Sequence, residues 1–159
     1  MKMKLKKSLT GLSFLLLLLG LNYQESFAHC EIPCGIYADS VSITLIKEHI
    51  TTIEKSMNQI EEISQSSKPN YNQLVRWVTN KEEHAKKIQE IVSQYFLHQR
   101  IKIVDEGQKE AYAKYQKHLE LLHKMSVYSM KCKQTTDLAF IEKLRTTVAD
   151  FEKAYFHKH

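Results

Sequence analysis

Apolar residues recur along most of the chain at alternating steps of three and four, the spacing of one face of an α-helix. The clearest case lies at about 40–66, where we predict a first helix. Its stripe consists of five isoleucines and one methionine: Ile43, Ile46, Ile50, Ile53, Met57 and Ile60. A stripe of this kind is stable only when other elements cover it, so the helix is expected to belong to a packed core.

Two similar patterns follow after short polar segments. Asn70 with Gln73 three residues later resembles a capping box, so a second helix is expected from Asn70 to near Arg100. A turn around Gly107 then precedes a third helix. The positions expected inward are Leu74, Trp77 or Val78, Ala85, Ile88, Val92 and Tyr95 in the second helix, and Ala111, Tyr115, Leu119, Leu122 and Met125 in the third.

A fourth helix completes the pattern, with Thr135 or Thr136 as its expected cap. Four amphipathic helices joined by short loops predict an all-α, up-down-up-down four-helix bundle, because this arrangement buries every stripe with little loop entropy. Proteins of many functions share that fold, so function has to be sought in residues outside the stripes. The fourth stripe is Leu138, Ile141, Leu144, Val148, Phe151 and Tyr155.

Residues 1–28 have the pattern of an export signal. MKMKLKK is basic, LTGLSFLLLLLGL is apolar, and a short polar stretch ends with small residues at Ser26 and Ala28. We therefore predict cleavage between Ala28 and His29, which leaves a segment at 29–38 and the bundle at 39–159. The apolar run is too short for a good membrane anchor. The mature protein is expected in the periplasm or outside the cell, touching the membrane only transiently during export.

Charge and cysteine content narrow the function further. The net charge is +5, but four lysines and one glutamate lie in the leader, so the mature chain carries about +2. This near balance gives no reason to expect a nucleic-acid partner. Three cysteines enter an oxidising compartment, and an odd number cannot all pair within one chain. Cys132 follows the third stripe and is expected to be a small buried residue.

Cleavage before His29 would create a metal-binding group at the new N-terminus. The amine of His29 and the amide nitrogen of Cys30 can close a five-membered ring on a metal ion, and the thiolates of Cys30 and Cys34 complete four donors. The His29 imidazole remains as an axial ligand. Such a planar set suits Ni²⁺ or Cu²⁺, whereas Zn²⁺ prefers a tetrahedron. Pro33 and Gly35 favour a compact turn between and after the thiolates.

The segment HCEIPCGIY resembles the N-terminal hook of the nickel superoxide dismutase family, His-Cys-x-x-Pro-Cys-Gly-x-Tyr from the first mature residue. The resemblance implies one nickel ion per subunit and dismutation of superoxide through Ni(II)/Ni(III) cycling. It also implies a homo-oligomer, a hexamer of four-helix bundles. The matching positions are His29, Cys30, Pro33, Cys34, Gly35 and Tyr37, of which His29, Cys30 and Cys34 would bind nickel and Tyr37 would stand over its open face.

Other features of the family are matched less closely. Tyr95 is the candidate for a second tyrosine near the metal. Ala38-Asp39 follows Tyr37 where some members have Asp-Pro. The family's glutamate and arginine near the axial histidine have no clear counterparts, and Glu48, Lys81 and Glu82 are the substitutes to consider.

Two other interpretations stay open. One is an exported helical module that binds copper or nickel without turnover. The other is a bundle tied by a Cys30–Cys34 disulfide. The remaining histidines show no spacing typical of a ligand pair: His49, His84, His98, His118, His123, His157 and His159.

Overall fold

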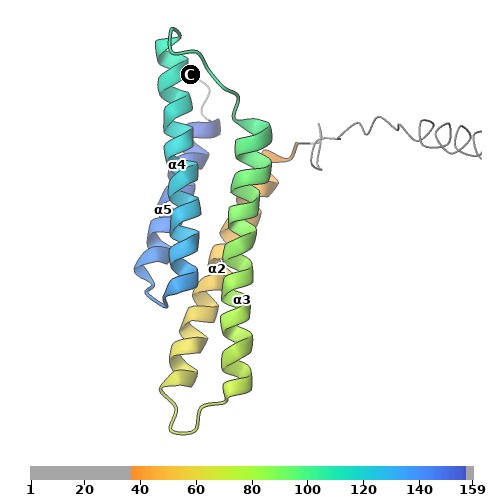
Figure 1. Ribbon diagram of the computed structural model, residues 1–159, viewed down its shortest axis with the longest axis vertical. Coiled ribbons are helices and arrows are strands. Elements are labelled where there is room, and N and C mark those ends of the chain that lie inside the picture. Colours follow the sequence, from red (N-terminus) through yellow and green to blue (C-terminus); the bar gives the residue numbers. More distant parts are fainter. Residues whose placement is uncertain (1–36, 157–159) are drawn as a thin grey trace, which may run out of the picture. The chain divides into compact units, whose positions relative to one another are not determined.

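The computed structural model describes residues 37–156, and every regular element among them is helical (Figure 1). The π-helix η1 continues α3 without a break, so the described residues form four helical rods, with α3 and η1 counted as one rod. The predicted all-α fold is confirmed, while the leader at 1–28 and most of the 29–38 segment lie outside the described residues. The elements are α2 (Asp39–Ser64), α3 (Tyr71–Glu90), η1 (Ile91–Arg100), α4 (Lys109–Gln134) and α5 (Ala139–Phe156).

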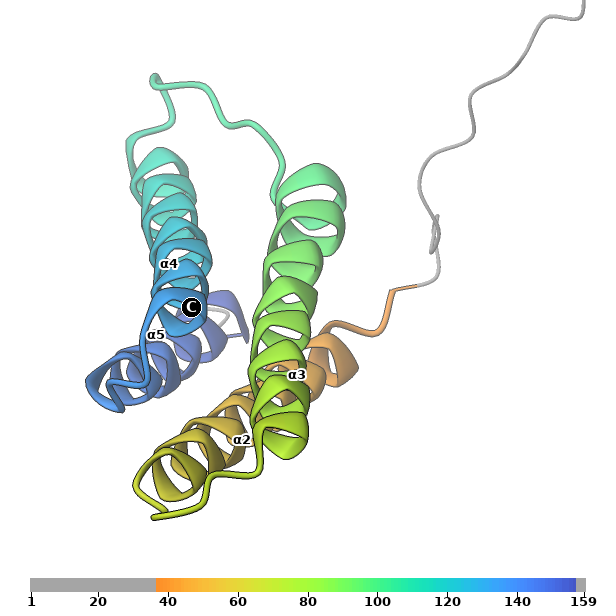
Figure 2. The ribbon, with the colours of Figure 1, turned by 60° about the horizontal axis from the view of Figure 1, so that its bottom comes forward.

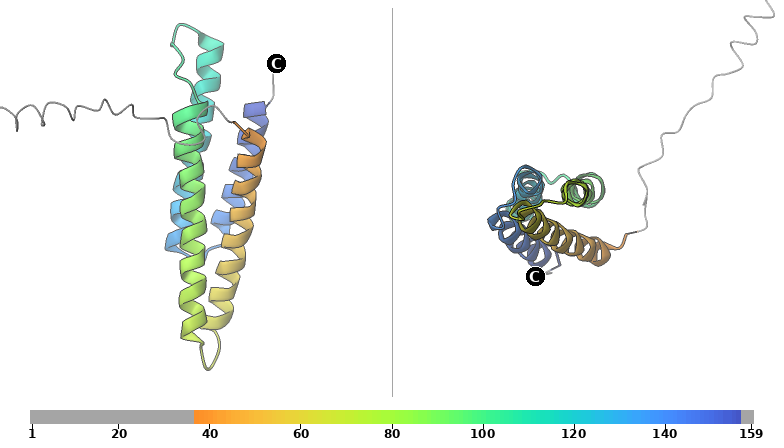
Figure 3. Two further views of the ribbon diagram at one scale, coloured as in Figure 1. Left: turned by 90° about the vertical axis from the view of Figure 1, so that its right-hand side faces the viewer. Right: turned by 90° about the horizontal axis from the view of Figure 1, so that it is seen from below.

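The rods alternate in direction and pack in chain order. α2 packs on α3, α3 on α4, α4 on α5, and α5 returns to α2 (Figures 2 and 3). The N-terminus of α2 and the C-termini of η1 and α5 lie at the same end of the bundle (Figure 1). This is the up-down-up-down arrangement expected from four stripes and short loops. Within residues 37–156, no helix has a stretch long and apolar enough to cross a membrane.

The stripe of α2 forms one wall of the core as predicted. None of its six apolar residues is more than 9% exposed, from Ile43 at one end to Ile60 at the other. Side chains of this size contribute about 1.5 to 3 kcal/mol each when fully buried. The opposing walls are formed by Ala85 and Ile88 of α3, Val92, Tyr95 and Phe96 of η1, Leu121, Leu122, Met125 and Cys132 of α4, and Ile141, Leu144, Val148 and Phe151 of α5.

The start of α3 is confirmed in its chemistry as well as its position. The Asn70 side-chain oxygen accepts a hydrogen bond of 3.2 Å from the backbone N–H of Gln73. This bond satisfies one of the first N–H groups of the helix, which have no partner within it. The neighbouring helix α2 starts one residue earlier and ends two residues earlier than the predicted 40–66.

The start of α5 differs from the prediction. Thr135 and Thr136 do not cap it; the carboxylate of Asp137 accepts a hydrogen bond of 2.9 Å from the N–H of Ala139. Thr135 instead accepts from the N–H of Asp137 at 3.1 Å, which shapes the turn before the helix. Because the helix begins later, Leu138 lies outside it and is 41% exposed, not buried.

The third stripe is also shifted in the structure. Ala111 is exposed in the first turn of α4, whereas Leu122 and Met125 are buried as expected. His118 and Leu121 also face the core, and the His118 Nε2 atom lies 3.2 Å from the carbonyl oxygen of Ala154 in α5. A histidine that bonds a backbone carbonyl can be buried without a charge, which explains its place among apolar residues.

Candidate functional site

Tyr37 is the first described residue and one of the predicted site residues. The predicted nickel ligands His29, Cys30 and Cys34 lie outside the described residues. The Tyr37 side chain is 46% exposed and stands two residues before α2 begins. Tyr37 therefore stands at the end of the bundle where α2 starts.

Two side chains of η1 hold the Tyr37 ring. Tyr95, which is 7% exposed, meets it edge to face with ring centroids 6.3 Å apart. The guanidinium carbon of Arg100 lies over the Tyr37 ring, 4.1 Å from its centroid, in a cation–π contact. The structure thus brings Tyr37 together with Tyr95, the residue singled out from the sequence as its aromatic neighbour.

Asp39 connects this region to three helices. Its Oδ1 atom accepts hydrogen bonds from Arg100 Nε at 2.7 Å and from the Tyr95 hydroxyl at 2.6 Å. Its Oδ2 atom accepts from Arg100 Nη2 at 2.6 Å and from the Tyr155 hydroxyl at 2.9 Å. We call these four residues the Asp39 network. One carboxylate at the start of α2 therefore joins that helix to η1 and to the end of α5.

The π-helical winding of η1 allows two of its residues to reach Asp39. The N–H of Ile101 bonds the carbonyl oxygen of Phe96 at 2.9 Å, a step of five residues. In a helix wound in this way, residues five apart lie over one another, as Tyr95 and Arg100 do. In an α-helix they would be about 1.4 turns apart and would face different directions.

The charges of the network compensate one another. Burial alone raises the pKa of Asp39, but hydrogen bonds from Arg100, Tyr95 and Tyr155 bring it below its ordinary value. The bond to Asp39 raises the pKa of Arg100 further. Burial, and then Asp39, raises the pKa of Tyr155 to about 12 and raises that of Tyr95. At neutral pH the network thus holds one carboxylate, one guanidinium and two neutral phenols.

Sequence analysis does not identify this network. Asp39 is 61 residues from Arg100 and 116 from Tyr155, so no local spacing links them. An acidic residue in the first turn of a helix already has an explanation in the helix dipole. The one signal available is that Asp39 follows so closely after Tyr37.

Lys81 lies elsewhere and has a different partner. Its ammonium donates to the carbonyl oxygens of Lys133 at 2.7 Å and Thr135 at 3.2 Å, and it is only 4% exposed. These bonds satisfy carbonyls at the C-terminus of α4. Lys81 precedes Tyr95 by 14 residues, about 20 Å along the helix. This argues against a place for Lys81 beside Tyr37 of the same chain, and Glu48 and Glu82 are exposed on the helix surfaces.

Cys132 is a core residue, as expected. Its side chain is 0% exposed, and burial raises the pKa of its thiol to about 11. A protonated, inaccessible thiol is neither a nucleophile nor a metal ligand.

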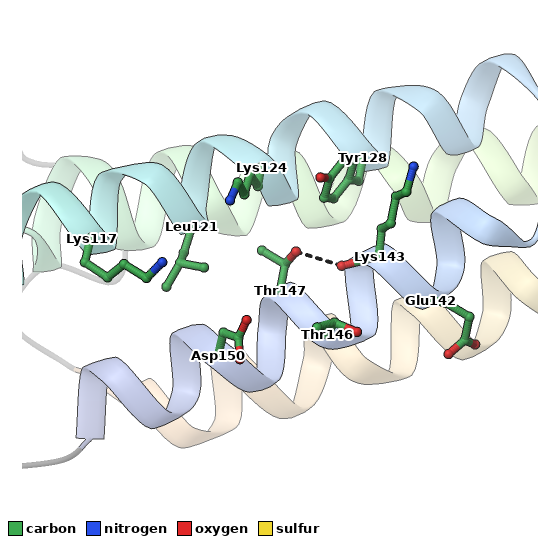
Figure 4. A pocket seen from close by; sticks show the side chains of 9 residues that line it. All are labelled: Lys117, Leu121, Lys124, Tyr128, Glu142, Lys143, Thr146, Thr147 and Asp150. Atoms are coloured by element: carbon green, nitrogen blue, oxygen red, sulfur yellow. Dashed lines mark hydrogen bonds between the residues drawn. The ribbon is translucent and has the colours of Figure 1, made fainter.

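A surface pocket between α4 and α5 contains none of the predicted site residues (Figure 4). Lys117 and Lys124 line it, and both bond the carboxylate of Glu120. The Thr147 hydroxyl on its floor donates to the carbonyl oxygen of Lys143 at 2.7 Å. Because it contains none of the predicted ligands and its two lysines are paired with Glu120, we assign no part of the site to it. The lining residues are Lys117, Leu121, Lys124, Tyr128, Glu142, Lys143, Thr146, Thr147 and Asp150.

Residues 37–156 contain no group of three or more histidine, cysteine, aspartate or glutamate side chains able to hold a metal ion. With cleavage before His29, as the sequence predicts, the segment before Tyr37 would offer donors that fit nickel: an amine and an imidazole from His29, the amide and thiolate of Cys30, and the thiolate of Cys34.

Comparison with known protein families gives a match over most of the chain. A family model described as nickel-containing superoxide dismutase matches residues 24–159, which include both the HCEIPCGIY segment and all described helices. No curated protein and no solved structure matched the chain. Because the family model covers well over half of its length, the chain belongs to the nickel-containing superoxide dismutase family.

Proposed function

We propose that this protein is a nickel superoxide dismutase that converts two superoxide anions and two protons into oxygen and hydrogen peroxide. Nickel held by His29, Cys30 and Cys34 would supply the Ni(II)/Ni(III) couple that takes an electron from one superoxide and gives one to the next. The family match supports the metal and the substrate. The observation that carries the proposal for this chain is the position of Tyr37 between Tyr95 and Arg100, directly after the donor segment.

The Asp39 network would fix the base of the metal-binding segment. Asp39 comes two residues after Tyr37 and accepts four hydrogen bonds from three side chains. A donor segment attached to a fixed point needs less ordering before it can bind metal and substrate in one geometry. Tyr37, stacked on Arg100, would then form a wall that limits access to small molecules.

Arg100 has a structural task here and does not attract substrate. Its positive charge is compensated by the two bonds to Asp39, at 2.7 and 2.6 Å. An anion arriving from solvent meets the Arg100–Asp39 pair as a nearly neutral unit. Attraction of superoxide would therefore have to come from lysines elsewhere on the protein. The guanidinium plane instead supports the Tyr37 ring.

An oligomer of exported subunits is part of the proposal. Tyr37, Val41 and Leu45 follow one another at steps of four residues and are 46%, 54% and 40% exposed. Val41 and Leu45 are one turn apart and share one side of α2, so an exposed apolar strip lies in the first two turns of the helix that follows Tyr37. Burial of this strip between subunits would also shield the metal segment. A solution mass equal to one chain would contradict the oligomer, and a hexamer is the state we expect.

The experiment is to produce the protein in an exporting host, sequence its N-terminus, count its metal and assay superoxide removal with and without nickel. We expect a chain that begins at His29, holds one nickel ion and is active. Replacing Cys34 with serine should abolish both nickel binding and activity, with helical content unchanged. A chain that begins at His29 and binds nickel without activity would be a metal-binding module. A metal-free chain with a Cys30–Cys34 disulfide would favour a structural role.

A further inference from the structure

His49 of α2 and His84 of α3 meet on the bundle away from the Asp39 network. Their Nδ1 atoms are 3.0 Å apart, and their rings meet edge to face with centroids 4.9 Å apart. Both side chains are half-buried. His49 lies ten residues beyond Asp39 on the same helix, a distance of about 15 Å. The two histidines are 35 positions apart, which explains why their spacing in the sequence does not suggest a pair.

The separation of the two nitrogens matches that of adjacent ligands on a metal ion. Imidazole nitrogens bind Zn²⁺ at about 2.0 to 2.1 Å, so two of them are about 2.9 Å apart at a right angle and about 3.3 Å apart at the tetrahedral angle that Zn²⁺ prefers. In the metal-free protein, one Nδ1–H donates to the other Nδ1, so the two nitrogens point toward each other. A divalent cation can replace that shared proton when both rings turn so that their lone pairs converge on it.

The surroundings favour the neutral imidazoles that metal binding requires. Burial, followed by His84 and then Lys87, lowers the pKa of His49, and burial followed by Lys87 lowers that of His84. The groups facing the pair carry both signs. Glu48 from α2 raises the pKa of His49, and Glu83 from α3 raises that of His84. The ammonium of Lys87 forms an ion pair of 3.2 Å with Glu83. A cation arriving between the rings would therefore meet the carboxylate of Glu48 and a Glu83–Lys87 pair whose charges largely cancel.

We propose that His49 and His84 form a second binding site, for a divalent transition metal such as Zn²⁺, Cu²⁺ or Ni²⁺, between α2 and α3. Neutral imidazoles suit these ions. The two histidines supply two adjacent positions, and water fills the others. The bound ion links the two helices at a point where they otherwise share one histidine–histidine hydrogen bond. The site is independent of the N-terminal segment, since all its groups lie within the described bundle.

The test uses Zn²⁺ and a chain in which Cys30 and Cys34 are replaced by serine, so that the N-terminal thiolates are absent. Calorimetric titration should show that the chain binds one Zn²⁺ ion. NMR spectra recorded during the same titration should show the side-chain signals of His49 and His84 moving together. His49→Gln or His84→Gln should weaken that binding by about a hundredfold or more, because even an outer-shell partner of a ligand is worth 10- to 100-fold in affinity.

His123→Gln is the matched control, since it removes an exposed histidine from α4. It should leave the Zn²⁺ affinity unchanged. Equal Zn²⁺ binding by all three variants would overturn the proposal. So would His49 and His84 signals that stay in place at saturating Zn²⁺ in the chain with both histidines, a result that does not depend on any histidine variant folding correctly.

Discussion

Two arginine–carboxylate pairs join helices of this bundle, and they differ in what surrounds them. Arg100 binds Asp39 through two bonds of 2.7 and 2.6 Å, and Arg145 binds Glu54 through two bonds of 3.0 and 2.6 Å. The side chains of the first pair are 24% and 16% exposed, those of the second 39% and 30%. The pairing chemistry is the same in both.

The neighbours of each pair show its role. Glu54 and Arg145 join α2 to α5, with Glu142 as one further partner of the arginine at 2.7 Å. Asp39 additionally accepts bonds from two tyrosines, and Arg100 supports Tyr37. An ion pair open to water contributes little to stability, whereas one enclosed by further donors leaves several groups unsatisfied when it is broken. The Glu54–Arg145 pair is therefore a matched control for the Asp39 network.

The largest difference is expected for removal of the carboxylates. Asp39→Ala leaves a partly buried guanidinium and two phenols without their acceptor, and we expect a loss of about 2 to 3 kcal/mol in the free energy of unfolding. Glu54→Ala should lose about 1 kcal/mol or less. Urea unfolding of both variants measures this. Equal losses would show that the surroundings of Asp39 add nothing.

The same two variants should separate in activity. In Asp39→Ala the base of the metal segment is no longer fixed, and a displacement of about 1 Å at a reacting centre can reduce the rate about 100-fold. Glu54→Ala should keep the activity of the unaltered protein per bound nickel ion. Full activity of nickel-loaded Asp39→Ala would contradict the role that we give to the network.

A smaller difference is expected when the charge is kept and the shape is changed. Arg100→Lys retains a cation but loses one of the two bonds to Asp39 and the flat stack on Tyr37, a loss of about 1 to 2 kcal/mol. Arg145→Lys should lose less, because its pair is more exposed. Thermal and urea unfolding provide the measurement, and a greater loss for Arg145→Lys would reverse the comparison.

Removing one hydroxyl should have a still smaller effect. Tyr155→Phe keeps the aromatic packing on Phe96 and Phe151 and deletes one bond to Asp39, which is worth about 1 kcal/mol. Tyr128→Phe is the control, since its hydroxyl makes no hydrogen bond within residues 37–156. Urea unfolding should rank Tyr155→Phe below Tyr128→Phe in stability, and the opposite ranking would count against the network.

The smallest effect concerns pH. The pKa of Asp39 is lowered in the folded protein, so its contribution to stability is fully present above the unfolded pKa near 3.8. That contribution is lost as the pH falls through the folded pKa. The stability difference between the unaltered protein and Asp39→Ala should therefore stay constant from about pH 7 to 5 and shrink below about pH 4. Glu54, whose pKa is also lowered, is present in both chains and cancels. A difference that grows in acid would contradict this sign.

Sequence patterns correctly predicted the structural features that depend only on residues close together in the sequence. The stripe from Ile43 to Ile60 and the Asn70 cap each depend on residues within a few turns, and both are confirmed. The predicted cap of α5 was wrong. Thr135, Thr136 and Asp137 are consecutive and all belong to residue types that cap helices, so local spacing does not show which of them does so. The wrong choice also put Leu138 in the core.

The Asp39 network could not be predicted, because its cause is not local. Val92 and Tyr95 continue the α-helical spacing of α3, so nothing in the pattern indicates a change to π-helical winding. That winding determines where Arg100 points. The proposed metal ligands present the opposite case, since the sequence motif predicts them while His29, Cys30 and Cys34 lie outside the described residues.

The central claim is that the bundle holds Tyr37 beside a nickel site whose first ligand is the amine of His29. One extra alanine placed between Ala28 and His29, such that cleavage leaves it at the N-terminus, tests this most directly. The altered position lies ten residues before α2 begins, so we expect the circular dichroism spectrum to be unchanged. Nickel-dependent superoxide removal should be abolished, because the amine has moved off the metal. Retained activity in the extended chain, verified by N-terminal sequencing, would contradict the account.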